Sequence, residues 1–247
     1  MSRMLAIVIT GLLAAPATIA QDIDLGTDAQ REEGRQLYMD KCAQCHGVEG
    51  DGNGPAKTVF RPQPRDFTSS TYKFRTTPSG ELPTDSDIMR SIREGMPYTG
   101  MPAWPSLSDG EVRNLMYFIK TFADDFSGPF AEVTPMEMPD DVSMSEESIE
   151  RGRVVYEENQ CFDCHGMAGR GDGKSATTLE DQWGVHIRPA DLTKRWTFRR
   201  GITREDIYKT FQTGLDGSPM PSYEIDPPED AWHLVNFVHS LSRDEPN

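Results

Sequence analysis

Two segments of the chain, Cys42-Ala43-Gln44-Cys45-His46 and Cys161-Phe162-Asp163-Cys164-His165, repeat one five-residue pattern and contain all four cysteines. Cys-x-x-Cys-His is the pattern by which a c-type haem is attached to protein. The two thiols form thioethers to the macrocycle, and the histidine that follows ligates the iron. The sequence therefore predicts two covalently attached haem c groups, with His46 and His165 as iron ligands.

Zinc binding and disulfide formation are the alternative roles for these cysteines. A four-cysteine zinc site normally separates its two pairs by about 15–20 residues, whereas these pairs lie in opposite halves of the chain. A thioredoxin-like redox pair or a structural disulfide accounts for one motif, but not for two that are each followed by histidine. Both alternatives leave His46 and His165 unexplained.

The chain also contains an internal repeat. The offset that carries Cys42 onto Cys161 carries Asp87-Ile88 onto Asp206-Ile207 and Gly95 onto Gly214. Near the end of each half, apolar residues recur at the i, i+3, i+4, i+7 spacing of an amphipathic helix. Between these matches the second half has an insertion at 183–187, and the first half has a longer loop at 76–84. The sequence therefore indicates two equivalent domains in tandem.

Helix signals place the motifs on defined elements. Capping boxes at Thr27-x-x-Gln30 and Ser143-x-x-Glu146 precede opening helices at 31–39 and 149–158, and Ser108-x-x-Glu111 precedes the first closing helix. No segment alternates convincingly as a strand. We therefore predict an all-α fold, in which each of two small helical domains surrounds one covalently bound haem.

The first 20 residues have the pattern of a secretory signal peptide, with an apolar run at 4–15 and small residues before Gln21. Cleavage is expected after Ala20, which predicts export to the periplasm. A retained membrane anchor is the alternative, although the run is shorter than the roughly 20 residues that a span needs. Domain 1 then covers 21–124 and domain 2 covers 145–247. The proline- and acid-rich linker at 125–144 is expected to be extended and poorly packed.

A methionine–proline pair follows each haem motif at the same distance. Met101 lies as far after Cys42 as Met220 lies after Cys161, so these thioethers are the predicted second axial ligands of the two irons. Met96 also precedes a proline, but the repeat places Leu215 at the equivalent position, and leucine cannot bind iron. Packing is the alternative role for any methionine. The first half has no histidine besides His46, whereas three alternatives stay open in the second half: His186, His233 and His239.

Each half resembles a class I cytochrome c, and the whole chain is similar to the two-domain, two-haem periplasmic cytochromes c. The resemblance rests on an opening helix, the haem motif, a proline-bearing loop, a Met-Pro loop and a closing helix, over 27–123 and 145–242. It implies that the carbonyls of Pro64 and Pro189 accept a hydrogen bond from the proximal histidines and orient their rings. It also implies that four residues contact the haem propionates, where arginine suits a carboxylate: Tyr72, Arg75, Trp196 and Arg199. Loop stiffening, packing or a solvated charge are the alternative roles.

An iron with two protein ligands changes oxidation state with little rearrangement and offers no open position to a substrate. We therefore expect a protein without catalytic residues or a small-molecule substrate, which carries single electrons between periplasmic or membrane-bound redox partners. Two alternatives stay open. One is a dedicated electron-transfer subunit of a larger oxidoreductase complex. The other is a dihaem peroxidase, which needs one haem able to open a coordination position.

The composition is acidic, with 40 Asp and Glu against 25 Lys and Arg and a formal net charge of −15. This charge makes nucleic acid an unfavourable partner. An acidic surface speeds encounter with a basic docking face on a redox protein, including one in a membrane complex. Solubility or adaptation to a saline habitat is the alternative reason for the charge.

Overall fold

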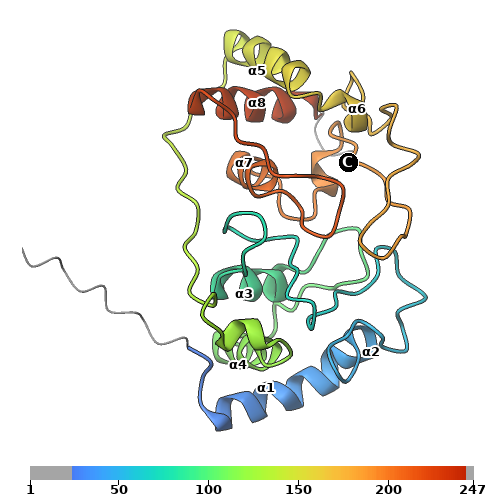
Figure 1. Ribbon diagram of the computed structural model, residues 1–247, viewed down its shortest axis with the longest axis vertical. Coiled ribbons are helices and arrows are strands. Elements are labelled where there is room, and N and C mark those ends of the chain that lie inside the picture. The colour runs from blue at the N-terminus through green and yellow to red at the C-terminus, as the bar shows by residue number, and fades with distance from the viewer. Residues whose placement is uncertain (1–23, 243–247) are drawn as a thin grey trace, which may run out of the picture.

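The two halves of the chain form two helical domains, one above the other in Figure 1, in a computed structural model that describes residues 24–242. Within those residues there is no strand, only an isolated bridge between Glu180 and His186. The all-α prediction is confirmed. The first domain contains α1 (Asp28–Lys41), α2 (Ala43–His46), α3 (Asp85–Glu94), α4 (Asp109–Lys120) and the 3-10 helix η1 (Asp124–Ser127). The second contains α5 (Glu146–Glu158), α6 (Phe162–His165), η2 (Arg195–Thr197), α7 (Arg204–Thr213) and α8 (Pro228–Leu241).

Capping boxes start most of the longer helices. The predicted boxes at Thr27 and Ser108 are present in full. The predicted box at Ser143 is wrong, because α5 is capped by Ser145, whose hydroxyl accepts from the amide of Ser148. The side chain of Asn236 binds the carbonyls just before Ser145, at 3.0 Å and 3.4 Å, and holds that segment outside the helix.

Two further boxes explain why Asp-Ile recurs in the two halves. Thr84 and Asp87 cap α3 reciprocally, and Thr203 and Asp206 cap α7 in the same way. Each aspartate is buried, and each is followed by a buried isoleucine. The repeated dipeptide therefore begins equivalent helices and anchors them in equivalent cores.

The opening and closing helices of each domain cross at a glycine. A Cβ atom on Gly34 of α1 would lie 1.9 Å from the carbonyl oxygen of Asn114 in α4. A Cβ atom on Gly152 of α5 would lie 1.9 Å from the carbonyl oxygen of His233 in α8. Only glycine permits this approach of two backbones, and the crossing brings the end of each opening helix, where the haem motif begins, onto the domain core.

The linker runs along the left edge of Figure 1 without a helix between η1 and α5, as expected. It is not poorly packed, which corrects the sequence prediction. The amide of Met136 donates to the carbonyl of Thr76 in the first domain at 2.8 Å, while Met136 packs against the apolar core of the second. Further along, the indole of Trp232 donates to the carbonyl of Pro139, and Asp141 pairs with Arg204 at 2.8 Å. Side chains of the second domain thus stabilise this extended path.

The domains also contact each other through buried arginines. The guanidinium of Arg75 is fully buried, donates to the carbonyl of Thr213 at 2.7 Å, and pairs with Asp216 at 2.9 Å. Arg200 donates in the opposite direction, to the carbonyl of Arg75. A third pair joins Arg90 of α3 to Asp206 of α7 at 2.6 Å.

Among residues 24–242, no helix is long and apolar enough to cross a membrane. The predicted signal peptide and its cleavage site at Ala20 lie outside the described residues.

Candidate haem-binding sites

Both Cys-x-x-Cys-His motifs form a single helical turn, and in the first domain Cys42, Cys45 and His46 all line one pocket. His46 and His165 each donate their amide to the carbonyl of the first cysteine of the motif, at 2.9 Å. A tyrosine of the preceding helix anchors each turn: Tyr38 donates to the carbonyl of Gly47, and Tyr156 to that of Gly166, both at 2.7 Å. The repeat therefore preserves the geometry of the motif as well as its sequence.

The four thiols are unpaired, and burial raises the pKa of both Cys42 and Cys161 to about 11. Among the described residues, no three His, Cys, Asp or Glu side chains converge in a way that could hold a metal ion. Neither a disulfide nor a four-cysteine zinc site is formed by this arrangement. Each pair of thiols instead stands beside its histidine, as thioether attachment requires.

The proximal histidines are oriented by backbone carbonyls, but these belong to the residue after each predicted proline. The Nδ1 of His46 lies 3.0 Å from the carbonyl oxygen of Arg65, and that of His165 lies 3.0 Å from the carbonyl oxygen of Ala190. The prediction for Pro64 and Pro189 is therefore wrong by one position. Both proline carbonyl oxygens lie close to a glycine in the loop after the motif: a Cβ atom on Gly52 would lie 3.0 Å from that of Pro64, and one on Gly171 would lie 2.8 Å from that of Pro189.

Burial lowers the pKa of both proximal histidines. The imidazole is therefore neutral near pH 7. Because Nδ1 donates to a carbonyl, the proton sits on that nitrogen and Nε2 keeps a free lone pair. A neutral, oriented imidazole is the form that ligates iron.

The two methionine loops have one hydrogen-bond pattern. The amide of Met96 donates to the carbonyl of Met101, and the amide of Leu215 donates to that of Met220, both at 3.0 Å. Met101 lines a pocket together with Cys42, Cys45 and His46, and Met96 lines it too. In the second domain Met220 and Cys161 both pack against the same apolar core. Met101 thus shares a pocket with both thiols of its domain, and Met220 shares a core with one thiol of its own.

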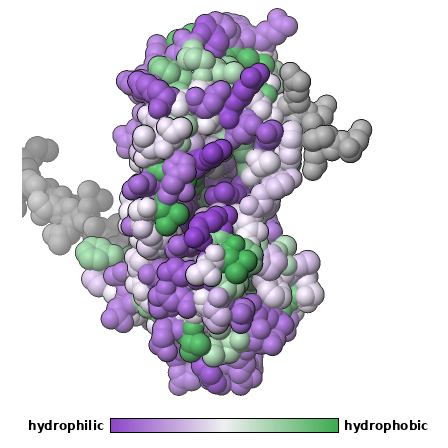
Figure 2. All heavy atoms as spheres, turned by 90° about the vertical axis from the view of Figure 1, so that its right-hand side faces the viewer, coloured by the Kyte–Doolittle hydropathy of each residue, from purple (hydrophilic) through white to green (hydrophobic). Residues whose placement is uncertain are grey.

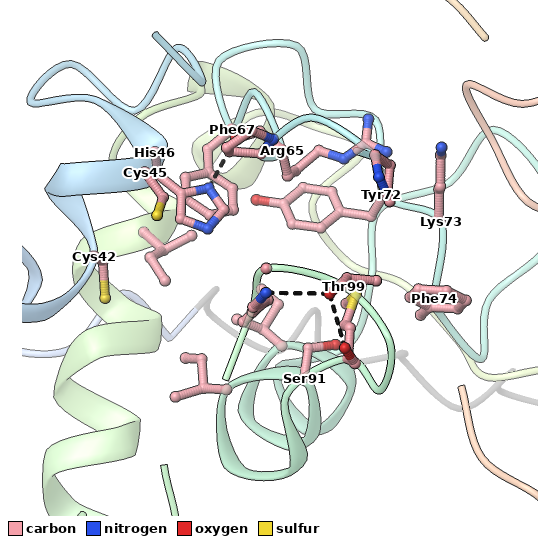
Figure 3. A pocket seen from close by; sticks show the side chains of 18 of the residues that line it. Cys42, Cys45, His46, Arg65, Phe67, Tyr72, Lys73, Phe74, Ser91 and Thr99 are labelled. Atoms are coloured by element: carbon pink, nitrogen blue, oxygen red, sulfur yellow. Dashed lines mark hydrogen bonds between the residues drawn. The ribbon is translucent and has the colours of Figure 1, made fainter. Parts of the chain in front are cut away.

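The pocket of the first domain has a polar side, which Figure 3 shows away from the two cysteines. Arg65, Tyr72 and Lys73 lie there, and Arg199 of the second domain joins them. The Tyr72 hydroxyl and one terminal nitrogen of Arg65 are buried, and neither has a hydrogen-bond partner in the part of the chain that the structure describes. Unpaired buried donors are costly, and acceptors such as the carboxylates of a haem would satisfy them. The residues present therefore fit a haem in this pocket.

Of the other two residues predicted to contact the haem propionates, one has a different role in the structure and one stays a prediction. Arg75 does not line the pocket, because its guanidinium is committed to Tyr72, Pro78, Thr213 and Asp216. That prediction is corrected. Trp196 lies in η2, and its propionate role stays a prediction.

Sequence reasoning missed two residues on the polar side of the pocket, Arg65 and Lys73, and the buried Arg200. The offset that aligns Pro64 with Pro189 also aligns Arg75 with Arg200. This match was the sequence signal that the two buried arginines are equivalent. No repeat marks Arg65, whose counterpart at that offset is Ala190.

Two helical domains, each with a haem-attachment turn, an oriented histidine and a methionine loop, define a two-domain c-type haem protein. The family model for cytochrome c matches residues 31–123 and 149–242, and the chain belongs to that family. Each domain therefore binds one covalently attached haem c, and electron transfer is the role of such domains.

A solved structure is similar to nearly the whole chain. It is a chain of the Kuenenia stuttgartiensis reducing HAO-like protein complex Kustc0457/Kustc0458, 39% identical, with a TM-score of 0.83. The similarity covers 90% of this chain and 99% of that one. A search of curated proteins finds no match.

Proposed function

We propose that this protein carries single electrons between redox proteins, and that each iron is held by one histidine and one methionine. His46 would act with Met101, and His165 with Met220. The observation that carries the proposal is the matched pair of methionine loops, in which the carbonyls of Met101 and Met220 accept the same hydrogen bond at 3.0 Å. Met/His ligation raises the reduction potential, which suits a carrier of fairly positive potential.

The axial assignment is tested by removing one thioether at a time. Met101→Ala and Met220→Ala should each turn one haem high-spin or water-bound and let that haem bind carbon monoxide readily. Met96→Ala is the matched control, because Met96 lines the same pocket but has leucine as its counterpart. A spectrum that changes with Met96→Ala and not with Met101→Ala would overturn the assignment.

The same measurement separates a carrier from a peroxidase. A carrier with two filled axial positions should bind carbon monoxide slowly at both haems and should not turn over peroxide. Rapid binding at one haem of the native protein, together with peroxide turnover, would replace the carrier by an enzyme.

A second candidate is a dedicated electron-transfer subunit of a larger oxidoreductase. The similarity to a chain of a reducing HAO-like complex, over 99% of that chain, favours it. Purification of the native protein at near-physiological salt should then recover it together with a second redox protein in a fixed stoichiometry. Recovery of the protein alone under those conditions would favour the free carrier.

We also propose that the protein is exported to the periplasm, on the pattern of its first 20 residues. Terminal sequencing of the mature protein should find Gln21 first. Recovery of the uncut chain in a membrane fraction would indicate a retained anchor instead.

A further inference from the structure

The second domain reaches the haem pocket of the first through the insertion that breaks the sequence repeat. Trp183, in this insertion, presents its ring to the guanidinium of Arg65, whose central carbon lies 5.2 Å from the ring centroid. Arg199, also in the second domain, lines the same pocket. The first domain has no counterpart to this insertion in the sequence repeat.

The insertion is built to hold Trp183 in place. The buried carboxylate of Asp181 accepts from the amides of Trp183 and Val185, at 3.0 Å and 3.1 Å. The amide of Asp181 in turn donates to the carbonyl of Val185 at 2.9 Å, and Gln182 donates to the carbonyl of Gly217 at 3.1 Å. The segment is therefore fastened to itself and to the second methionine loop.

Arg65 connects this insertion to the first haem site in two ways. Its carbonyl accepts the hydrogen bond from His46, and its guanidinium lines the pocket with one terminal nitrogen that is buried and has no hydrogen-bond partner among residues 24–242. The indole covers the guanidinium from the side of the second domain. Stacking on an indole keeps a guanidinium in a defined orientation.

We infer that the second domain completes the binding site for the carboxylates of the first haem, and that Trp183 raises the reduction potential of this haem by holding Arg65 in the pocket. A ferric haem carries one more positive charge than a ferrous haem. A guanidinium fixed nearby therefore disfavours the ferric state. Trp183 is a positioning residue in this arrangement, and Arg65 supplies the charge.

The inference depends on the haem of the first domain and not on the identity of either redox partner. It also does not depend on the methionine ligands. The role of Trp183 would therefore hold even if the protein were not an electron carrier. Conversely, the carrier function does not require that Trp183 affects the potential of the first haem.

A potentiometric titration of the full-length dihaem protein tests the inference. Trp183→Leu should lower the potential of the first haem and leave that of the second unchanged. Arg65→Met should lower it further, toward a tenfold change in the reduction equilibrium, which is about 59 mV for one electron. A variant with Cys161→Ala and Cys164→Ala retains only the first haem, so its titration shows which of the two potentials belongs to that haem.

A double-mutant cycle isolates the contact between the two side chains. In the Arg65→Met background, Trp183→Leu should cause no additional shift, because the charge that Trp183 positions is already absent. Trp183→Phe, which keeps an aromatic ring, should retain most of the native potential. Gln182→Ala, at the exposed position just before the insertion, keeps the backbone amide that bonds Gly217, is the matched control and should shift neither haem.

Three outcomes would overturn the inference. They are an unchanged first potential in Trp183→Leu, equal shifts of both haems, and a shift by Trp183→Leu that persists in the Arg65→Met background. Unchanged visible spectra and circular dichroism would show that the variants retain the fold. Should Trp183→Leu fail to fold, Trp183→Met removes the ring in the same way and should also lower the first potential.

Discussion

The carboxylate of Asp216 lies 2.9 Å from the guanidinium of Arg75, and this pair joins the second methionine loop to the first domain. The Arg75 side chain is fully buried and that of Asp216 is 19% exposed. The same carboxylate accepts from the hydroxyl of Ser79 at 2.8 Å and the amide of Gly80 at 2.9 Å. The loop that precedes Met220 is thus held by three groups of the other domain.

Asp216→Asn should destabilise the contact between the domains. It leaves the buried cation of Arg75 without its carboxylate, at a cost of roughly 3 kcal/mol, the lower end of the range for a broken buried pair. Denaturant titration should show a lower midpoint and less cooperative unfolding. Glu224→Gln, at an exposed position of the same domain, should leave the transition unchanged. Equal midpoints for the two variants would show that the pair contributes nothing.

Gly34→Ala should destabilise the first domain, because the new methyl group would lie 1.9 Å from the carbonyl oxygen of Asn114. The helices must move apart, which costs about 1–3 kcal/mol or more. Gly110→Ala in α4 is the control, since the nearest atom to its Cβ is 3.9 Å away. That variant should be neutral or stabilised by up to about 1 kcal/mol. A loss of stability in Gly110→Ala equal to that in Gly34→Ala would contradict the close approach.

Lys73 should make the first haem sensitive to pH. Burial, together with the nearby charges of Arg65 and Arg199, lowers the pKa of Lys73 to about 8, and Asp181 opposes this shift. Deprotonation removes a positive charge from the pocket, so the first potential should fall as pH rises through about 8. Lys73→Met should have a lower potential that is flat across this interval. Lys57→Met, outside the pocket, should retain the native profile.

The lowered pKa of Lys73 also has a consequence for stability. The unfolded chain, with an ordinary pKa of 10.5, binds this proton more tightly than the folded chain does. The contribution of Lys73 to the free energy of unfolding should therefore rise between about pH 8 and pH 10.5. Denaturant titrations of native protein and Lys73→Met across this interval should converge as pH rises. A constant difference would contradict the shift.

Electron exchange with a basic redox protein should slow as salt increases. The chain has a formal net charge of −15, and the face in Figure 2 is largely hydrophilic. Between 0.01 M and 0.15 M salt the Debye length falls from about 30 Å to about 8 Å, which screens long-range attraction. Stopped-flow rates with a basic and a neutral partner of similar potential would separate steering from general salt effects. A salt-independent rate with the basic partner would assign the charge to solubility.

The haem motifs and the long helices were predictable because each depends on residues close together in sequence, and the tandem repeat was predictable because one offset relates matching residues in the two halves. Thr27 and Ser108 begin helices through contacts within one turn, and apolar spacing marks the buried faces. The prediction that proline carbonyls accept from the proximal histidines was wrong by one position. The acceptor for His46 depends on the path of a loop, which composition does not specify.

The contacts between the domains were not predictable. Arg75 resembled a residue of the haem site, and only the placement of Thr213 and Asp216 beside it shows a role in joining domains. The sequence placed Trp183 in an insertion that makes this part of the second half longer than the first, but gave it no role. Its position over Arg65 follows from the packing of segments far apart in the chain.

The anchored path of the linker implies that covalent continuity between the domains is largely dispensable. Met136 bonds to one domain and packs on the other, and the segment up to Asp141 is held by side chains of α7 and α8. A chain cut once within 125–144 would leave two polypeptides that still bury Arg75 and Arg200 against each other. The two domains would then stay associated like two different subunits of a dimer. The distance between the two irons would not change after the cut.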